Sequence, residues 1–135
     1  MSLKSTAIFS ILLILLLSPS SFAGTPEERG LRVTEAVICR DVVDRTPQET
    51  GEVFPSSVGK LFAFTRIEGA TGETNIKHLW FFNDRLMAEV SLPVRSANWR
   101  TYSSKRILPQ WTGSWRVDIT TEDGLLLKSL HFRIE

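Results

Sequence analysis

His78 and Glu89 are the residue types that could support general acid–base chemistry, because a histidine held by a carboxylate can act as a general base. Strict pairing around a turn at Asn83-Asp84 would place the two side chains opposite one another. No nucleophile accompanies them: the chain lacks a Gly-x-Ser-x-Gly motif, and Ser103-Ser104-Lys105 does not match the Ser-x-x-Lys spacing of serine–lysine acyl enzymes. The pair is therefore predicted to be structural, worth about 0.2–1 kcal/mol across two strands, and no enzymatic activity is expected.

Metal and cofactor chemistry is equally poorly supported. The candidate soft ligands are Cys39, His78 and His131, and no two of them have the close spacing of a designed metal site. We therefore expect no metal and no cofactor. Cys39 lies in an apolar-rich stretch, which predicts a buried and inert thiol, with a reactive or intermolecular thiol as the alternative.

Large aromatic residues interleaved with arginines form the pattern with the clearest functional content. Trp, Tyr and Arg dominate the energetically important contacts of protein interfaces, and sugars also stack on aromatic platforms. The candidate partner-binding residues are His78, Trp80, Trp99, Arg100, Tyr102 and Trp111. The alternative is structural: the aromatic side chains pack against an opposing sheet, with arginines stacked over the indoles as cation–π pairs.

A β-hairpin over residues 77–90 is expected to position this set. Asn83-Asp84 tolerates the positive φ angles of a two-residue turn. Unbroken pairing from that turn predicts the partners Phe82–Arg85, Phe81–Leu86, Trp80–Met87, Leu79–Ala88 and His78–Glu89. Alternation then predicts a core face made of Leu79, Phe81, Leu86, Ala88 and Val90, and an outward aromatic and charged face made of His78, Trp80, Phe82, Arg85, Met87 and Glu89.

The remaining pattern is also that of strands. Further strands are predicted over residues 31–43, 60–68, 98–105, 114–121 and 125–134. Residues 44–57 are expected to be a polar loop, and residues 107–113 a loop that carries Trp111. With about seven short strands and no helical periodicity beyond the N-terminal segment, the expected fold is an all-β, antiparallel, immunoglobulin-like β-sandwich, with a small barrel as the alternative.

The first 23 residues have the features of a cleavable signal peptide. Lys4 precedes an apolar run over residues 7–17, and Ser21-Phe22-Ala23 places small residues at the first and third positions before a cut. The run is shorter than the roughly 20 residues of a spanning helix, although an uncleaved anchor is the alternative. We expect cleavage near Ala23, a flexible leader over residues 24–30, a single domain over residues 31–135, and a periplasmic or secreted protein without a membrane span in its mature form.

Charge argues against nucleic acid as a partner. The chain has 16 Lys and Arg against 15 Asp and Glu, and losing Lys4 with the signal peptide balances the two. Nucleic-acid binders instead carry a basic excess or a basic stripe.

Several blocks resemble the bacterial family called domain of unknown function 2914 (DUF2914). They are His78-x-Trp80, Asn83-Asp84-Arg85, Ala88-Glu89-Val90, the run from Trp99 to Lys105, and the run from Trp111 to Val117. The likeness extends from about Leu61 to Phe132. The resemblance implies a module that occurs alone after a signal peptide or attached to membrane segments, and it implies no chemistry.

Together these patterns predict a non-catalytic binding module. We expect it to mediate protein–protein interaction or scaffolding in the bacterial envelope. A module that binds envelope or extracellular polysaccharide through the same aromatic residues is the alternative.

Overall fold

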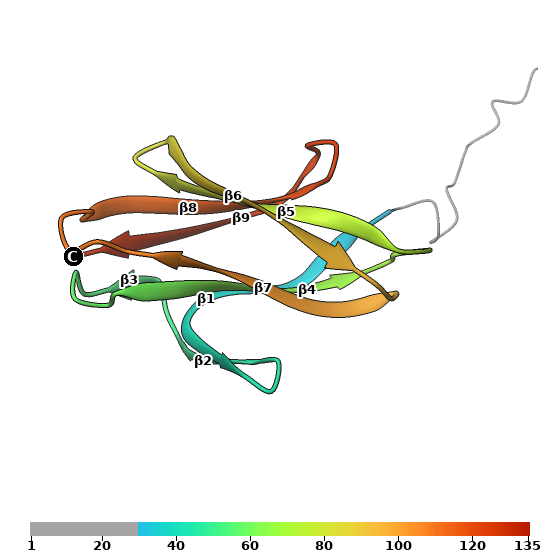
Figure 1. The fold of residues 1–135 in the computed structure, drawn as a ribbon, viewed down its shortest axis with the longest axis horizontal. Coiled ribbons are helices and arrows are strands. Elements are labelled where there is room, and N and C mark those ends of the chain that lie inside the picture. Colours follow the sequence, from blue (N-terminus) through green and yellow to red (C-terminus); the bar gives the residue numbers. More distant parts are fainter. Residues whose placement is uncertain (1–29) are drawn as a thin grey trace, which may run out of the picture.

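The computed structural model describes residues 30–135, which form two β-sheets packed face to face (Figure 1). The strands are β1 (Arg32–Val43), β2 (Thr46–Thr50), β3 (Val53–Phe54), β4 (Lys60–Glu68), β5 (Thr74–Phe82), β6 (Arg85–Val94), β7 (Asn98–Arg106), β8 (Gly113–Thr121) and β9 (Leu126–Ile134). This confirms the all-β sandwich. The expected signal peptide over 1–23 and all but the last residue of the expected leader lie outside the described residues.

The strand order matches that of an immunoglobulin-like sandwich. One sheet has four strands in the order β2-β1-β4-β7, and the other has five in the order β3-β9-β8-β5-β6. The three strands β1-β4-β7 correspond to strands A-B-E of that fold, and the four strands β9-β8-β5-β6 correspond to its strands G-F-C-C′. Neighbouring strands are antiparallel except for β3, which runs parallel to β9.

The structure has nine strands rather than about seven, because the predicted loop over residues 44–57 is wrong. It contains β2, which continues β1 as a hairpin, and β3, which joins the five-stranded sheet. β2 is short and polar and β3 has only two residues, so neither shows the alternation that identified the others. Figure 1 shows β2 on the side of the four-stranded sheet that faces away from the five-stranded one.

The strands predicted over residues 60–68 and 114–121 are confirmed as β4 and β8. On β4 the buried side chains of Leu61, Ala63, Thr65 and Ile67 point into the sandwich. On β8 the inward residues are Trp115, Val117 and Ile119, each at most 2% exposed. Around them the core divides into two clusters, one centred on Trp80, Trp115 and Phe132, and the other on Ile67, Ile76 and Ile119.

The β5–β6 hairpin has the predicted turn but not the predicted register. Asn83 and Asp84 have φ angles of 47° and 63°, as a two-residue hairpin turn requires. The pairs Phe82–Arg85 and Phe81–Leu86 are confirmed. A β-bulge then inserts Met87, so that Trp80 lies opposite Ala88 instead, and every later pair on β6 is displaced by one residue.

The prediction for the two faces of β5 was wrong. His78 and Trp80 are fully buried, whereas Leu79 and Phe81 face away from the other sheet and Leu86 is 50% exposed. Ala88 faces inward as predicted, because the bulge moves it into line with Trp80. The aromatic ring therefore points into the core, as does the buried Trp that is typical of strand C in immunoglobulin domains.

Cys39 ends the part of β1 that pairs with β4 and is fully buried, as expected. Burial raises the pKa of its thiol. Beyond Cys39, β1 pairs with β2 through a turn in which Asp44 and Arg45 have positive φ angles. This turn brings the Arg45 side chain to β7.

Among the described residues, no helix is long and apolar enough to cross a membrane.

Candidate functional site

The predicted partner-binding residues occupy three separate places in the sandwich. His78 and Trp80 are buried between the sheets, so their prediction as surface contacts is wrong. Trp99, Arg100 and Tyr102 line one groove beside β7. Trp111 lies in the loop after β7, beyond the other end of that strand.

His78 and Trp80 belong to a polar core network with Thr65 and Ser103. The His78 Nδ1 lies 2.6 Å from Ser103 Oγ, and the His78 Nε2 lies 3.3 Å from Thr65 Oγ1. Trp80 Nε1–H donates to Ser103 Oγ at 3.1 Å. Since β5 supplies the ring residues and β4 and β7 supply the hydroxyls, the network joins the two sheets through the core.

The donors and acceptors of the network determine where its protons lie. Thr65 donates its hydroxyl to the Thr101 carbonyl at 3.4 Å, so it can only accept from His78. His78 must then carry its proton on Nε2, and its bare Nδ1 accepts the Ser103 hydroxyl proton. Ser103 still has a lone pair for the Trp80 N–H, which leaves every polar group of the network satisfied.

A second proton on His78 would break this arrangement, because Nδ1–H and the Ser103 hydroxyl proton would then compete for the same space. Burial also lowers the pKa of His78 to about 4, so the ring is neutral in the folded protein at neutral pH. The predicted partner Glu89 is not involved, because it points to the opposite side of β5 and pairs with Lys77 at 3.3 Å. The His78–Glu89 pair was therefore predicted wrongly.

The contact between His78 and Ser103 has the geometry of a base and a nucleophile, but its setting is that of a structural link. The two residues are 0% and 5% exposed, and Ser103 also accepts a hydrogen bond from Trp80. Sequence reasoning missed Ser103 as a partner of His78. The available signal was its alternation with Trp99 and Thr101, which places it on the inward face of β7.

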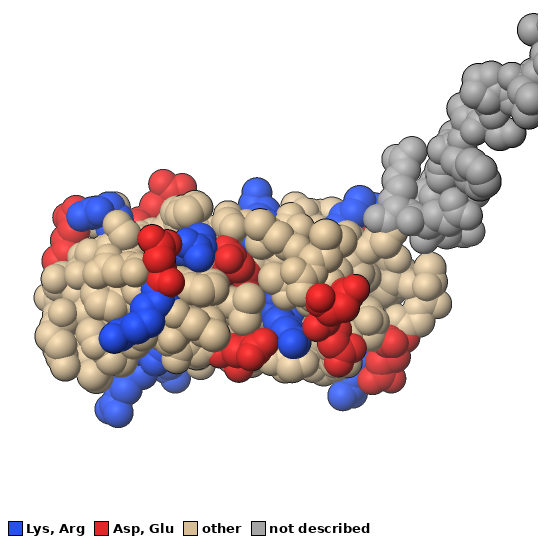
Figure 2. All heavy atoms as spheres, turned by 90° about the horizontal axis from the view of Figure 1, so that it is seen from above, with Lys and Arg blue, Asp and Glu red and all other residues tan. Residues whose placement is uncertain are grey.

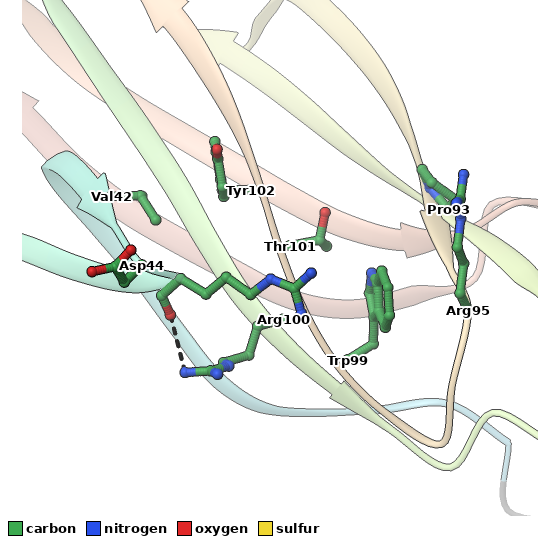
Figure 3. Close-up of a pocket in the computed structure, with 9 residues that line it drawn as sticks. Val42, Asp44, Pro93, Arg95, Trp99, Arg100, Thr101 and Tyr102 are labelled. Atoms are coloured by element: carbon green, nitrogen blue, oxygen red, sulfur yellow. Dashed lines mark hydrogen bonds between the residues drawn. The ribbon is translucent and has the colours of Figure 1, made fainter.

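The groove beside β7 is a site that can receive a ligand, and it contains three of the predicted partner-binding residues. It has a volume of about 480 Å³, and we call it the β7 groove. Its lining residues are Val42, Asp44, Arg45, Pro93, Arg95, Trp99, Arg100, Thr101 and Tyr102. Figure 3 shows Trp99, Arg100 and Tyr102 on β7 between Val42 and Asp44 on one side and Pro93 and Arg95 on the other. The groove thus joins the β1–β2 turn, β7 and the end of β6.

The β7 groove is rich in arginine and poor in carboxylates. Arg45 lies over the Trp99 ring at 5.3 Å, and its carbonyl accepts a hydrogen bond from Arg100 Nη1 at 3.1 Å. Of the three arginines in the lining, Arg95 alone makes a salt bridge within the described residues, a solvent-exposed one to Glu73 at 3.8 Å. Tyr102 adds an aromatic ring and is 44% exposed. The groove can therefore bind an anionic group next to an apolar or planar one.

Arg45 was not among the predicted site residues, because residues 44–57 were assigned to a plain loop. Little in the sequence indicates that Arg45 belongs to the groove, because a charged residue at a turn normally faces solvent. Its place over Trp99 follows from the β1–β2 hairpin, which carries it back along the sheet.

Trp111 makes its contacts away from the groove. Lys105 Nζ lies 5.0 Å from the centre of its ring, and its carbonyl accepts a hydrogen bond from Trp115 Nε1 at 3.0 Å. The ring also lies 6.1 Å from that of Trp115. These contacts anchor the loop to the core, and Trp111 does not complete the β7 groove.

The outer face of the five-stranded sheet has arginine and aromatic residues in a different arrangement. Arg116 lies over the Phe81 ring at 4.3 Å and contacts Asp84 at 2.6 Å and Asp118 at 3.0 Å. The hydrogen bond to Asp84 raises the pKa of this guanidinium. Figure 2 shows that acidic and basic side chains are interspersed over this face. Its charges are largely neutralised by one another.

Within residues 30–135, no group of three or more His, Cys, Asp or Glu side chains is placed to hold a metal ion.

Comparison with known proteins gives a match to one family model over part of the chain and no activity. A solved β-glucosidase from Kluyveromyces marxianus has a TM-score of 0.43 and 10% sequence identity; the match covers 78% of this chain and 14% of that one. The chain thus spans a small part of that enzyme, and the likeness is too weak to carry an argument. No curated protein matches the sequence. The model of the family described as "Protein of unknown function (DUF2914)" matches residues 73–134, which contain β5 to β9. The match covers the C-terminal part of the chain, the region in which the sequence blocks that resemble this family are concentrated.

Proposed function

We propose that this protein is a non-catalytic binding module of the bacterial envelope, periplasmic or secreted, that binds a protein partner through the β7 groove. The observation that carries the proposal is the grouping of Trp99, Arg100 and Tyr102 with Arg45 and Arg95 in one groove. Arginine and large aromatic residues are the types that contribute most to interface affinity.

Electrostatics supports the same site. Neither Arg45 nor Arg100 forms a salt bridge in the described part of the chain, so an incoming carboxylate would be their first ionic partner there. Charge-assisted hydrogen bonds to arginine are about twice as strong as neutral ones. A partner that presents acidic side chains would therefore gain more from this groove than from the self-neutralised face around Arg116.

An acidic polysaccharide is the second candidate, and the exposed Tyr102 ring beside the groove arginines is what favours it. A sugar ring could stack on Tyr102 while its carboxylate pairs with Arg100. The broad platform expected from Trp80 does not contribute, because Trp80 is buried.

Site-specific photo-crosslinking tests the proposal. A photoreactive amino acid replaces Tyr102 in the full chain, and the matched control replaces Leu86, which is similarly exposed (50% against 44%) on the other sheet. In the cells that produce the protein, we expect the residue at position 102 to crosslink to one discrete protein. The residue at position 86 should give no such adduct, and adding Arg100→Ala should abolish the adduct at position 102. Equal labelling at both positions would contradict the site.

A fluorescence titration separates the two candidates. Trp99 is half-buried in the groove, so a bound glycan should change its emission, and Trp99→Phe identifies that part of the signal. We expect no saturable change with alginate or with dextran as probes. A saturable response to alginate alone would replace the protein partner with an acidic polysaccharide.

A further inference from the structure

The four edge strands of the two sheets differ in how well they are protected against pairing with another chain. β3 has only two residues, and β2 has five, with Pro47 and a positive φ angle at Glu49. β6 carries Pro93 and the bulge opposite Trp80. Short strands, prolines and bulges are the usual means of blocking an edge.

β7 has none of these three features, and its only protection of the edge is its charged side chains, Arg100, Lys105 and Arg106. It runs for nine residues, and all nine pair with β4 in unbroken register, without a proline or a bulge. A long regular edge of this kind presents a row of unpaired backbone groups that can accept an added strand.

The register shows which backbone groups of β7 point to the open side. Gly69 N–H donates to the Ala97 carbonyl, and Ile107 N–H donates to the Gly59 carbonyl. Because alternate residues of an antiparallel strand bond to the same neighbour, the odd-numbered residues between 97 and 107 bond to β4. The N–H and C=O groups of the even-numbered residues, among them Arg100, Tyr102 and Ser104, therefore face the free edge.

The side chains along this edge indicate the chemistry of an added strand. Arg100, Tyr102 and Arg106 lie on one face of β7 because they are two or four residues apart. Residues of an added strand on that face would lie beside the two arginines, and acidic side chains fit there. On the other face, the added strand would meet Trp99 and the neighbouring Pro93 of the groove, which suits apolar side chains.

We infer that β7 binds an extended peptide segment, with acidic and apolar residues alternating, as an additional antiparallel or parallel strand of the four-stranded sheet. This inference rests on the proposed function and specifies its partner. In this mode the backbone hydrogen bonds supply affinity, and the alternating side chains supply specificity.

The first test is hydrogen exchange of the full chain with a synthetic probe. The probe is a peptide of the same length as β7 in which glutamate alternates with valine. In the free protein, the amides of residues 100, 102 and 104 should exchange faster than those of 101 and 103. Saturating peptide should slow the even-numbered amides by about tenfold or more, while a lysine–valine peptide should leave them unchanged.

Methylation of the peptide backbone tests the hydrogen bonds themselves. Alternate N–H groups of the bound peptide would donate to β7. N-methylation of one of these should weaken binding by about tenfold per site, because the methyl group removes the donor, whereas N-methylation of an intervening residue should have little effect. Binding that is insensitive to the position of the methyl group would overturn the inference.

A variant of the protein provides the reciprocal test. Ser104→Pro removes an outward-facing N–H and leaves the bonds of the odd-numbered residues to β4, since a proline is tolerated at that position of an edge strand. Thermal melting should confirm that the variant folds, and peptide binding should weaken by about tenfold or more. Ser104→Ala, which keeps the N–H, should bind as the unaltered chain does.

The outcomes separate the inference from the proposed function. Strand addition would be overturned if the peptide left the exchange of the even-numbered amides unchanged and if Ser104→Pro bound the peptide as the unaltered chain does. A protein adduct at position 102 would in that case still support the β7 groove as a protein-binding site. Absence of both the adduct and peptide binding would overturn both. Slowed exchange of the even-numbered amides on adding alginate instead of the peptide would overturn the peptide as the occupant.

Discussion

The polar core network and the β7 groove share strand β7 and use similar residue types, yet they differ in how their polar groups are satisfied. Ser103 points inward and completes a closed set of hydrogen bonds with His78 and Trp80. Arg100 points outward to a groove in which it donates to a backbone carbonyl. A polar group that is buried must find its partners within the protein, whereas an exposed one can keep its capacity for a ligand.

The difference teaches that an aromatic residue beside a polar one does not by itself indicate a binding site. The same Trp and His that resembled a contact surface in the sequence are a link between sheets in the structure. Changes in the network should therefore affect the free energy of unfolding, and changes in the groove should affect binding.

Trp80→Ala should cause the largest loss of stability. The side chain is fully buried and packs edge-to-face on Phe132 at 6.2 Å, so its removal should lower the free energy of unfolding by about 3–5 kcal/mol. Denaturant melts measure this. Trp99→Ala, at the half-buried groove position, should cost less, and an equal loss for both would remove the distinction between the two regions.

The network should make stability depend on pH. The pKa of His78 is lowered from 6.5 to about 4 in the folded protein, so the unfolded chain binds the proton more readily between these values. Stability should be fully present above pH 6.5 and fall as the pH drops toward 4, by up to about 3 kcal/mol. Urea melts across this range should show a shallower pH dependence for His78→Asn than for the unaltered chain, and an equally steep dependence in the variant would contradict the prediction.

Ser103→Ala should leave two buried groups without partners, the His78 Nδ1 and the Trp80 N–H. An unsatisfied buried polar group costs about 1–3 kcal/mol, which we expect as the loss of unfolding free energy. The neighbouring Ser104 is exposed, so Ser104→Ala should stay within about 0.5 kcal/mol of the unaltered chain. Similar losses in the two variants would mean that the network does not stabilise the fold.

The smallest effects should come from the arginines. Arg116→Ala removes contacts to Asp84, Asp118 and Phe81 and should cost about 1 kcal/mol. Arg100→Ala should cost less than about 0.5 kcal/mol, because it loses one exposed hydrogen bond. Chemical denaturation of the two variants measures the difference, and a larger loss for Arg100→Ala would assign it a structural role instead.

Where strands alternate cleanly, the sequence was sufficient. The strands over residues 60–68 and 114–121 and the Asn83-Asp84 turn were predicted correctly, since they depend on local periodicity and on backbone conformation. The faces of β5 could not be chosen in this way. Apolar residues occur on both of its sides, and the bulge at Met87 breaks the alternation carried across the turn.

The residues that β7 contributes to the groove could be predicted from the sequence, whereas the arginines from other strand ends could not. Trp99, Arg100 and Tyr102 were identified together because they are neighbours in the sequence. Arg45 and Arg95 come from other strand ends, and only the folding back of the β1–β2 hairpin and the course of β6 bring them there.

The sequence by itself determined the class of fold, the central hairpin turn and the resemblance to the DUF2914 family over residues 73–134, because these follow from period-two patterns, turn residues and local motifs. The tertiary structure alone decided which aromatic residues are buried. That choice depends on which face of β5 meets the opposing sheet, and it is made by packing Trp80 against Phe132 and satisfying His78 with hydroxyls from β4 and β7, none of which are neighbours in the chain.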